Sequence, residues 1–456
     1  MRLFSITTGW CRQCQKTVPA RTIEDGGRIW LERFCPDHGP LRTLIEHDPE
    51  RYSQSLAYVK PSLNPAGRWA PSFSGCPQSC GLCPEHRQHT CLPVAEITDQ
   101  CDLKCPICLK PKKASFGLTP EEFRRTLAKL ADYEGSLTLL NLSGGEPTLH
   151  PRFGEFIEIA RQMGVAQTTV STNGLKLLAD PNLRALLART RTVAALQFDT
   201  FDDQVCQKLR GRRLVSEKMR LIELLEREDV PYSLTAVAVK DVNDGELAAL
   251  ADFFFSSKAL SLMIQPVAVT GAAGDSFGPE NRLTMGETID ALESTSFINQ
   301  GDLVPLACSH PRCAASAYYF KASETRFVSL KDFLGQQEYL DVTVNRSFPG
   351  IDSQGHQAIK NKLYDIWANL DRNSDDSALL DRVRTFLRRI EGRTLTEAEA
   401  FELGREAVKS VFIHSLMDEY CFDLDRLIKC CNHYLRADGR LVPMCAQNVT
   451  GAQLAL

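Results

Sequence analysis

The chain has 456 residues, of which 43% are hydrophobic and 24% charged, and its formal net charge is −4. This composition is that of a globular protein with an ample core, and a weakly negative chain without Lys/Arg runs argues against nucleic-acid binding. No apolar run approaches the roughly 18 residues that span a bilayer, and the first residues lack a signal-peptide pattern. We therefore expect a cytoplasmic protein, with peripheral membrane contact left open.

Cysteine is the outlying residue type, with 17 copies. The cysteines are grouped at metal-ligand spacings, and in a large chain without an export signal this indicates metal binding rather than disulfides. Thiolate ligands to iron require a reducing compartment and are lost to oxygen. The composition therefore predicts a metal-rich enzyme.

Residues 1–60 carry Cys11-x2-Cys14 and then Cys35-Pro-Asp-His38. Two ligand knuckles separated by the β-like stretch 28–34 are the layout of a rubredoxin-like module or zinc ribbon with three cysteines and one histidine. Such a ligand set suits either zinc or a single iron. His38 alone would also suit a solvated turn, but the C-P-x-H-G spacing favours ligation.

A polar connector spans residues 40–75, and residues 61–93 are the predicted auxiliary iron–sulfur cluster segment, with a C-x3-C-x2-C triplet followed by one more cysteine. These four residues are Cys76, Cys80, Cys83 and Cys91. Four thiolates so close in sequence are enough to ligate an auxiliary 4Fe-4S cluster completely.

The same triplet spacing occurs again in Cys101, Cys105 and Cys108, directly after the apolar run 94–98. Three thiolates on one loop leave one iron of a 4Fe-4S cluster without a protein ligand. A structural zinc site is the competing interpretation, but zinc loops usually pair one C-x2-C with a second, distant pair. A strand is predicted directly before this second triplet, and alternating strands and helices are predicted after it. This context favours the catalytic role for Cys101, Cys105 and Cys108.

From residue 94 to residue 275, apolar runs alternate with helical patterns. The predicted strands are 94–98, 137–143, 166–171, 192–199, 231–239 and 260–269. The predicted helices between them are 119–133, 152–163, 181–189, 203–227 and 244–256, and a capping box from Thr119 to Glu122 marks the first helix start. Six strands with crossover helices predict an α/β fold, namely a partial (β/α)6 barrel.

Polar motifs follow the predicted strands at their carboxyl ends, where reactive groups of such folds gather. Besides the cysteine loop, these motifs are Gly144-Gly145-Glu146-Pro147, Ser171-Thr172-Asn173-Gly174, Gln197-Phe198-Asp199 and Gln265-Pro266. Their shared position predicts a single site. For Gln197 and Asp199 we expect contact with substrate or cofactor, and a hydrogen-bonded network within the rim is the alternative.

Residues 276–456 are less regular, with a loop predicted at 345–357 and helical patterns near 358–392 and 395–410. This region carries further cysteines that are separated by more than a hundred residues. We predict that they ligate a second auxiliary cluster, which would couple metal loading to folding. The predicted ligands are Cys308, Cys313, Cys431 and Cys445, with Cys430 as the alternative to Cys431.

The second triplet and the Gly-Gly-Glu-Pro motif together resemble the radical S-adenosylmethionine (SAM) enzymes. The resemblance implies that Cys101, Cys105 and Cys108 ligate the catalytic cluster, whose open iron is chelated by SAM. It also implies reductive cleavage of SAM to a 5'-deoxyadenosyl radical, which abstracts hydrogen from an unactivated C–H bond of the substrate.

The resemblance further implies the residues that contact SAM. In that family the Gly-Gly-Glu-Pro motif contacts the methionyl amino group, and two glycines allow the backbone to approach the ligand closely. The carried-over contacts are Gly144, Gly145, Glu146 and Pro147 for the amino group, Ser171, Thr172 and Asn173 for the ribose or carboxylate, and Gln265 at the adenine edge.

The order of motifs over almost the full length is similar to the branch that contains tetraether lipid synthase and pterin methyltransferase-like proteins. It implies one catalytic and two auxiliary 4Fe-4S clusters, one mononuclear iron or zinc, and a reductant such as a flavodoxin or ferredoxin. We predict C–C bond formation on a lipid or alkyl chain, with methylation of a pterin or other heterocycle as the alternative. Cys421, Arg212 and Arg213 depart from the expected pattern and leave the substrate open.

A third interpretation belongs to a different class, a non-catalytic iron or zinc protein in which the cysteine knuckles only stabilise the fold. The motifs at 144–147 and 171–174 argue against it, because structural metal sites do not require them.

Overall fold

The computed structural model describes residues 1–64, 75–77, 80–81, 83–110, 117–135, 137–307, 309–332, 334–344, 385, 388–389 and 395–450. Cys308 and the loop predicted at 345–357 lie outside the described residues, as does almost all of the helical pattern near 358–392.

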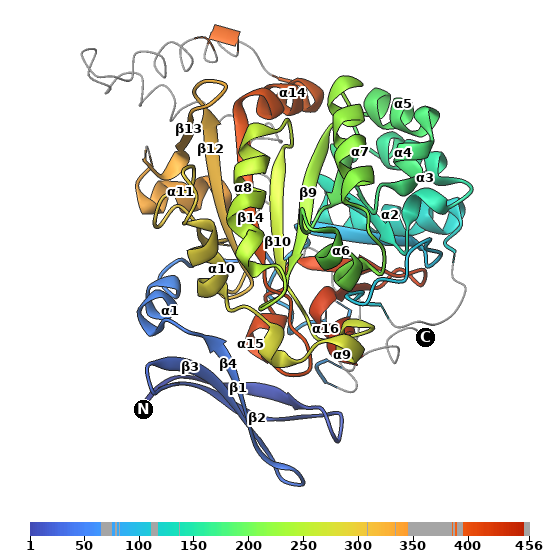
Figure 1. Ribbon diagram of the computed structural model, residues 1–456. Helices are drawn as coiled ribbons and strands as arrows, with labels where there is room; N and C mark the ends of the chain where they lie inside the picture. Colours follow the sequence, from blue (N-terminus) through green and yellow to red (C-terminus); the bar gives the residue numbers. More distant parts are fainter. Residues whose placement is uncertain are drawn as a thin grey trace, which may run out of the picture.

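The N-terminal residues form a four-stranded antiparallel sheet in sequential order. Its strands are β1 (Arg2–Cys11), β2 (Lys16–Asp25), β3 (Arg28–Cys35) and β4 (Gly39–Glu46). Strand β3 alternates strictly, with Ile29, Leu31 and Arg33 buried, as expected for a sheet with one covered face. A short helix, α1 (Pro49–Ser55), begins at the N-cap Asp48 and leads away from this sheet. Figure 1 shows the sheet in blue, below the main body of the molecule.

The main body is a parallel α/β barrel, as predicted. Its first strands are β5 (Leu92–Thr98), β6 (Leu139–Gly144), β7 (Gln167–Thr172), β8 (Val193–Gln197), β9 (Tyr232–Ala238) and β10 (Ser261–Pro266). The helices that cover them are α2 (Pro120–Glu134), α3 (Phe153–Gln162), α4 (Leu175–Ala179), α5 (Pro181–Thr190), α6 (Asp203–Arg210), α7 (Val215–Arg227) and α8 (Leu247–Ser256). One large buried apolar cluster joins the strands to these helices.

Two details of the barrel helices bear on the predictions. The capping box at the start of α2 is confirmed, because Glu122 N donates to Thr119 Oγ1 at 3.2 Å and Thr119 N donates to Glu122 Oε2 at 2.8 Å. The single helix predicted over 203–227 is instead two helices. Gly211 adopts a φ of +77° and ends α6, and this left-handed conformation terminates a helix.

The region after residue 275 adds a strand to each edge of the predicted six. Strand β14 (Val408–His414) pairs in parallel with β10, and β15 (Asn432–Leu435) pairs in parallel with β5. Eight parallel strands therefore run from β14 to β15.

The remaining elements of this region lie around those two edges. They are α9 (Ala273–Ser276), α10 (Met285–Leu292), β11 (Val304–Pro305), β12 (Ala314–Lys321), β13 (Phe327–Ser329), α11 (Gln336–Thr343), α14 (Glu397–Ala407), α15 (Leu424–Leu427), β16 (Leu441–Pro443) and α16 (Met444–Thr450). In Figure 1, α15, α16 and α9 lie at the end of the barrel that faces the N-terminal sheet, and α14 lies at the opposite end.

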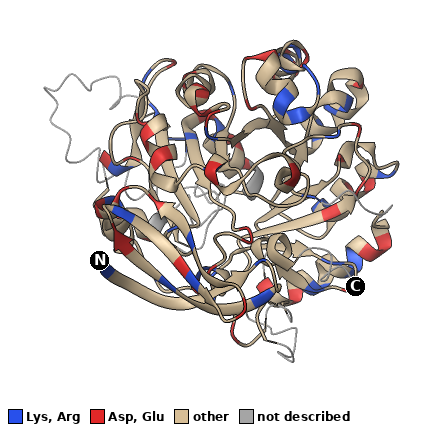
Figure 2. Ribbon diagram, turned by 60° about the horizontal axis from the view of Figure 1, so that its bottom comes forward, with Lys and Arg blue, Asp and Glu red and all other residues tan. Residues whose placement is uncertain are grey.

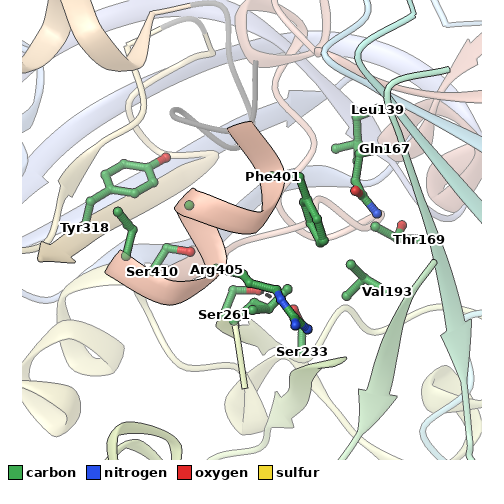
Figure 3. Close-up of a pocket in the computed structure, with 13 residues that line it drawn as sticks. Leu139, Gln167, Thr169, Val193, Ser233, Ser261, Tyr318, Phe401, Arg405 and Ser410 are labelled. Carbon is green, nitrogen blue, oxygen red and sulfur yellow. Dashed lines mark hydrogen bonds between the residues drawn. The ribbon is translucent and has the colours of Figure 1, made fainter. Parts of the chain in front are cut away.

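Helix α14 covers the amino-terminal end of the barrel, within the helical pattern predicted at 395–410. Figure 3 shows Phe401 and Arg405 extending from α14 toward the first residues of the strands. With Ser233 and Ser261 they border a small cavity of about 70 Å³. Arg405 is held there by an ion pair with Asp229 at 3.0 Å. Helix α14 therefore closes this end of the barrel as a floor.

Charged residues of both signs are interspersed along the ribbon, as Figure 2 shows. None of the described helices combines the length and the apolar character needed to cross a membrane.

Candidate active site at the carboxyl ends of the barrel strands

The cysteine loop follows β5, and its three predicted ligands open onto one cavity. Cys101 is exposed, whereas Cys105 and Cys108 are half-buried. All three line a cavity of about 1640 Å³ that is also bordered by the carboxyl ends of β6 to β10 and runs into the barrel. An iron–sulfur cluster held by these thiols would therefore face open space, where a further ligand can reach it. The loop fits the catalytic cluster that the sequence resemblance implies.

The two glycines after β6 hold the start of this loop. Gly145 N donates to Thr98 O, and Glu146 N donates to Gln100 O, each at 2.7 Å. A Cβ at Gly144, where φ is +139°, would lie 2.0 Å from Thr98 O, and a Cβ at Gly145 would lie 2.3 Å from Gln100 O. The glycines are thus required by contact with the loop itself, before any contact with a cofactor is considered.

The buried carboxylate of Glu146 connects the carboxyl ends of β6 and β7 through hydrogen bonds. Its carboxylate accepts hydrogen bonds from Thr148 N, Thr148 Oγ1, Thr172 Oγ1 and Asn173 N, at 2.5 to 3.2 Å. Burial raises the pKa of Glu146, and these hydrogen bonds oppose the shift. Pro147 begins the single 3-10 turn that follows (Pro147–Leu149). The contact of this motif with the methionyl amino group stays a prediction.

The Ser-Thr-Asn motif after β7 also holds the cysteine loop. Asn173 Nδ2 donates to Asp102 Oδ1 at 2.6 Å, which ties the end of β7 to the loop between its first two cysteines. Ser171 instead bonds to Asn141, which also accepts from Thr169 at 2.9 Å. Sequence reasoning missed Asn141, although a single amide in the run Leu-Leu-Asn-Leu was a usable signal.

Asp199 is fully buried and pairs with Arg210 through two short contacts, 2.6 Å and 2.8 Å. Its carboxylate also accepts from Val237 N at 2.9 Å and from Gln197 Nε2. Burial opposes ionisation, but Arg210 and these hydrogen bonds outweigh it and hold the Asp199 pKa below its ordinary value. Burial raises the pKa of the Cys105 thiol, and the nearby charge of Arg210 opposes that shift. The ion pair thus places a fixed positive charge beside a predicted cluster ligand.

Besides Arg210, a second buried cation lies near the rim, Lys218 on α7. Sequence reasoning missed Lys218. Its amine donates to the backbone oxygens of Asn173 and Gln197 and to Gln197 Oε1. Burial lowers the pKa of Lys218 to about 8, and Arg210 adds to the shift. A lysine within a helical pattern is usually solvated, so no sequence signal singled it out.

Below the rim, polar side chains line the interior of the barrel. Ser261 Oγ donates to Ser233 Oγ at 2.8 Å across β10 and β9. The polar side chains on the cavity wall from β6 to β10 are Asn141, Ser143, Thr169, Ser171, Thr172, Gln197, Ser233, Thr235, Ser261 and Gln265. Such convergent hydrogen-bonding groups fix the orientation of a bound ligand.

The predicted N-terminal metal site is assembled in the structure. The ligand atoms of Cys11, Cys14, Cys35 and His38 all lie within 4.8 Å of one another. The Cys14 and Cys35 sulfurs are 3.8 Å apart, and His38 Nδ1 is 3.5 Å from Cys11 Sγ and 3.4 Å from Cys35 Sγ. Zinc–ligand bonds of about 2.0–2.3 Å at a tetrahedral centre require separations of about 3.5–3.8 Å. The four residues therefore fit one tetrahedral metal ion.

The described cysteines predicted for the second auxiliary cluster border the large cavity. They are Cys313, Cys431 and Cys445, together with the alternative Cys430. Cys80 and Cys445 belong to one buried apolar cluster, against which Cys76 packs. Cys91 packs instead beside Cys431. Cys206 is buried against Leu103 and Leu214.

Two family models match the chain. Residues 95–254 match the model described as the radical SAM superfamily, and residues 3–47 match the model described as the HMPTM N-terminal zinc ribbon domain. The first covers the strands and helices from β5 to α8, and the second covers the four-stranded sheet.

Among curated proteins, the chain is similar to the 7,8-dihydro-6-hydroxymethylpterin dimethyltransferase of Methanocaldococcus jannaschii. The identity is 25% over 98% of this chain and 94% of that protein. The GTP 3',8-cyclase of Synechocystis sp. is 26% identical over 34% of this chain and 48% of that protein. The chain thus spans about half the length of this cyclase and nearly all of the dimethyltransferase.

Among solved structures, the chain matches Streptococcus suis SuiB bound to S-adenosylmethionine with a TM-score of 0.37 and 19% identity, and the match covers 43% of this chain and 44% of SuiB. Methylornithine synthase has a TM-score of 0.36 and 16% identity, and the match covers 45% of this chain and 62% of that protein.

Proposed function

We propose that this chain, an iron–sulfur enzyme with a radical SAM domain at residues 95–254, methylates a polar heterocycle of the pterin class. SAM and a reduced 4Fe-4S cluster, when bound, would supply a 5'-deoxyadenosyl radical that abstracts hydrogen from a C–H bond. The methyl group would come from a separate one-carbon donor, such as a second SAM that leaves as S-adenosylhomocysteine, and an external reductant such as a flavodoxin or ferredoxin would supply the electrons. The observation that carries the proposal is the row of hydrogen-bonding side chains along the barrel interior, directly below the predicted cluster ligands.

The barrel wall also carries apolar side chains, such as Val193 and Met263, but its hydrogen-bonding groups suit a heterocycle better than an alkyl chain. A pterin ring offers donors and acceptors along its edges, and Asn141, Thr169 and Ser171 already form a connected polar network on this wall. An alkyl chain would offer these side chains no hydrogen-bond partner beyond those they give one another, and each buried group that stays unpaired costs about 1–3 kcal/mol. Phe401 and Arg405 also close the amino-terminal end of the barrel. A long alkyl chain bound in the barrel could therefore not extend through that end.

Two further observations support the proposal. The M. jannaschii relative, named as a hydroxymethylpterin dimethyltransferase, is similar over nearly the whole chain. The N-terminal sheet matches a zinc ribbon model, and its ligand geometry suits zinc.

The residues of this chain have distinct tasks in the proposed reaction. Cys101, Cys105 and Cys108 would hold the catalytic cluster, and Gly145 and Asn173 keep their loop in position.

The test is anaerobic reconstitution followed by product mass analysis with a reduced hydroxymethylpterin and, separately, with a lipid extract. The proposal expects a mass gain of one or two methyl groups on the pterin, together with 5'-deoxyadenosine. Products containing a new C–C bond between lipid chains, with the pterin unchanged, would overturn it in favour of the lipid reaction.

A matched pair of variants separates binding from chemistry. Asn141→Ala should lower pterin methylation while SAM cleavage without pterin continues, because Asn141 lies away from the cysteine loop. Cys105→Ala should abolish both. Equal pterin methylation by wild type and Asn141→Ala would contradict the role of the polar wall.

A further inference from the structure

The segment 415–427, from the end of β14 to the end of α15, lies between the large cavity and the N-terminal sheet (Figure 1). Ser415, Leu416 and Met417 at its start line the cavity, and so does Arg426 near its end. None of the residues 1–47, all of which the structure describes, lines this cavity. The 415–427 segment therefore connects the cavity to a sheet that carries only the ribbon ligands.

Arg12 lies inside the first ligand knuckle of the ribbon, between Cys11 and Cys14. Its guanidinium donates to Glu419 Oε2 at 3.1 Å and to Tyr420 Oη at 2.6 Å. The Arg12 side chain is 55% exposed, so this ion pair alone adds little stability. The contact nevertheless means that the loop around the metal site is also a loop that touches the 415–427 segment.

Arg33 on β3 makes a buried contact with the same segment, and it is only 3% exposed. Its Nη1 donates to Trp10 O at 3.2 Å and to Glu419 O at 2.9 Å, and its Nη2 donates to Thr43 Oγ1 at 2.8 Å. Hydrogen bonds from a charged donor are stronger than those between neutral groups. A Cβ at Gly9 would lie 2.7 Å from Arg33 Cγ, so the glycine leaves room for this side chain.

The position of Arg33 joins the segment to both ligand knuckles. Arg33 precedes the ligand Cys35 by two residues, and the Trp10 carbonyl that it binds directly precedes the ligand Cys11. A metal ion that binds both knuckles fixes their separation, because metal–ligand bonds have narrow ranges of length. A bound metal should therefore hold Arg33 in the geometry in which it reaches residue 419.

A second connection runs from β1 to the start of α15. Thr7 Oγ1 donates to Asp423 Oδ1 at 2.7 Å. The same carboxylate oxygen accepts from Asp425 N at 3.0 Å and so caps α15, and the other oxygen pairs with Arg312. A side-chain oxygen at this position stabilises the first turn of a helix. A hydroxyl of the N-terminal sheet thus helps to orient the group that begins α15.

Helix α15 carries these contacts to the cavity. The ring of Trp10 meets that of Phe422 edge-on, with 6.2 Å between the ring centroids, and Phe422 directly precedes the cap of α15. Arg426 on this four-residue helix is buried, lines the cavity and donates to Ser415 O at 2.8 Å. Because α15 is so short, a shift at its first residue also moves Arg426.

The barrel holds the segment as well, through Asp418. The Asp418 carboxylate accepts from Val269 N at 2.8 Å and pairs with Arg282 at 2.8 Å. It also accepts from Tyr420 N at 2.9 Å, so this anchor fixes the chain as far as the turn at residue 420. The residues that follow, up to α15, are the ones that Trp10 and Thr7 contact from the sheet.

We propose that a metal ion bound in the ribbon positions the 415–427 segment and, through α15, the Arg426 side chain on the cavity wall. The N-terminal sheet is then a positioning module for the cavity, and it acts through Arg33 and Thr7. Loss of the ribbon metal should loosen residues 419–427 and leave distant barrel helices unchanged. The inference concerns the ribbon alone and does not depend on which substrate the cavity binds.

The test is hydrogen–deuterium exchange with mass spectrometry on the full chain after anaerobic reconstitution, which requires no assay of activity. Cys14→Ala removes one ribbon ligand, and zinc and iron counts verify that a single metal ion is lost. Amide exchange in residues 419–427 should become several-fold faster, because opening this segment then costs less free energy. Exchange in α3, which lies on the side of the barrel away from the sheet in Figure 1, should stay unchanged.

Two variants keep every ribbon ligand and remove one connection each. Thr7→Val deletes the hydroxyl that donates to Asp423, and Arg33→Lys keeps the charge but loses the forked geometry of the guanidinium. Both should retain the ribbon metal and still speed exchange in residues 419–427, with the larger factor for Arg33→Lys. Arg21→Lys is the matched control, because Arg21 pairs with Glu32 within the sheet at 2.8 Å, and it should exchange as wild type does.

The combined variant Cys14→Ala/Arg33→Lys tests whether the metal acts through Arg33. The proposal expects a combined factor smaller than the product of the two single factors, because both changes break the same connection. Fully multiplicative factors, or unchanged exchange in residues 419–427 after the metal is lost, would overturn the proposal. An equal increase in α3 would also overturn it. If Cys14→Ala does not fold, the exposed ligand His38 offers the milder variant His38→Ala, to which the same criteria apply.

Discussion

The two C-x3-C-x2-C triplets have the same spacing and opposite surroundings. Cys80 and Cys83 of the first triplet are only 4% and 9% exposed, and C-terminal residues at the barrel edge pack against Cys80. The second triplet opens onto the large cavity, and its first cysteine is exposed. Identical ligand spacing therefore yields a closed site in one place and an open site in the other. Access to a metal held by either loop would be decided by what packs on that loop.

The loops are also held by different parts of the chain. Backbone groups of the Gly144-Gly145 turn, within the same barrel, hold the second triplet. The first triplet depends on residues more than 300 positions later, such as Cys445 and Met417. We expect the open site to respond to changes in the rim and the closed site to respond to changes in the C-terminal segment.

The largest effect should come from removing one ligand of each triplet. Cys105→Ala should abolish 5'-deoxyadenosine formation, because the open cluster loses a ligand. Cys80→Ala should leave SAM cleavage detectable while the iron and sulfide content falls by one cluster. Both are measured on anaerobically reconstituted protein. If Cys80→Ala abolished cleavage and Cys105→Ala did not, the roles of the two triplets would be reversed.

The next effect concerns the buried ion pair behind the open triplet. Asp199→Asn leaves Arg210 buried without its anionic partner, and removing one member of a buried pair costs about 3–5 kcal/mol. The side chains of Asp199 and Arg210 are 1% and 11% exposed. Urea unfolding should report this loss.

A surface pair provides the control for that prediction. Arg161 and Glu158 are paired at 3.0 Å but are 65% and 36% exposed, so Glu158→Gln should cost less than about 0.5 kcal/mol. Equal losses in the two variants would show that the Asp199 pair does not stabilise the rim.

A smaller effect is expected where the glycine turn meets the cysteine loop. A Cβ at Gly145 would lie 2.3 Å from Gln100 O and 2.6 Å from Asp99 O, and such overpacking costs about 1–3 kcal/mol. Gly145→Ala should therefore lower the unfolding free energy and the occupancy of the open cluster. At Gly245, in the 3-10 turn Asp244–Glu246, a Cβ would meet no atom within 4 Å, so Gly245→Ala is the matched control. If Gly145→Ala also lowered the occupancy of the closed cluster, the effect would not be local to the open triplet.

Much of this comparison was available from the sequence. The alternation of apolar runs and helical patterns predicted the barrel from β5 to β10, and the capping box at Thr119 marked one helix start correctly. The ribbon ligands Cys11, Cys14, Cys35 and His38 were also recognisable, because they are close in sequence and their spacing is characteristic.

What sequence reasoning missed depends on long-range packing. Strands β14 and β15 are 7 and 4 residues long and join the barrel across more than 100 residues of chain, so no local pattern marks them as barrel strands. The burial of Lys218 likewise depends on long-range packing, because the ends of β7 and β8 pack against α7 and accept hydrogen bonds from the Lys218 amine. The split at Gly211 could have been read from the glycine, which commonly ends a helix.

The smallest predicted effect tests the tie between β7 and the open triplet. Asn173→Ala removes the hydrogen bond from Asn173 Nδ2 to Asp102 Oδ1 at 2.6 Å and the one from Leu175 N to Asn173 Oδ1 at 2.9 Å. With a typical contribution of about 0.5–1.5 kcal/mol each, the variant should be roughly 1–2 kcal/mol less stable. Because Asp102 lies between the cluster ligands, a chelator should strip iron from the open cluster several times faster, followed by absorbance. Exposed Asn182 on α5 offers the matched variant Asn182→Ala, which should behave as wild type. If the closed cluster were lost at the same increased rate, the tie would act on the whole barrel rather than on this loop.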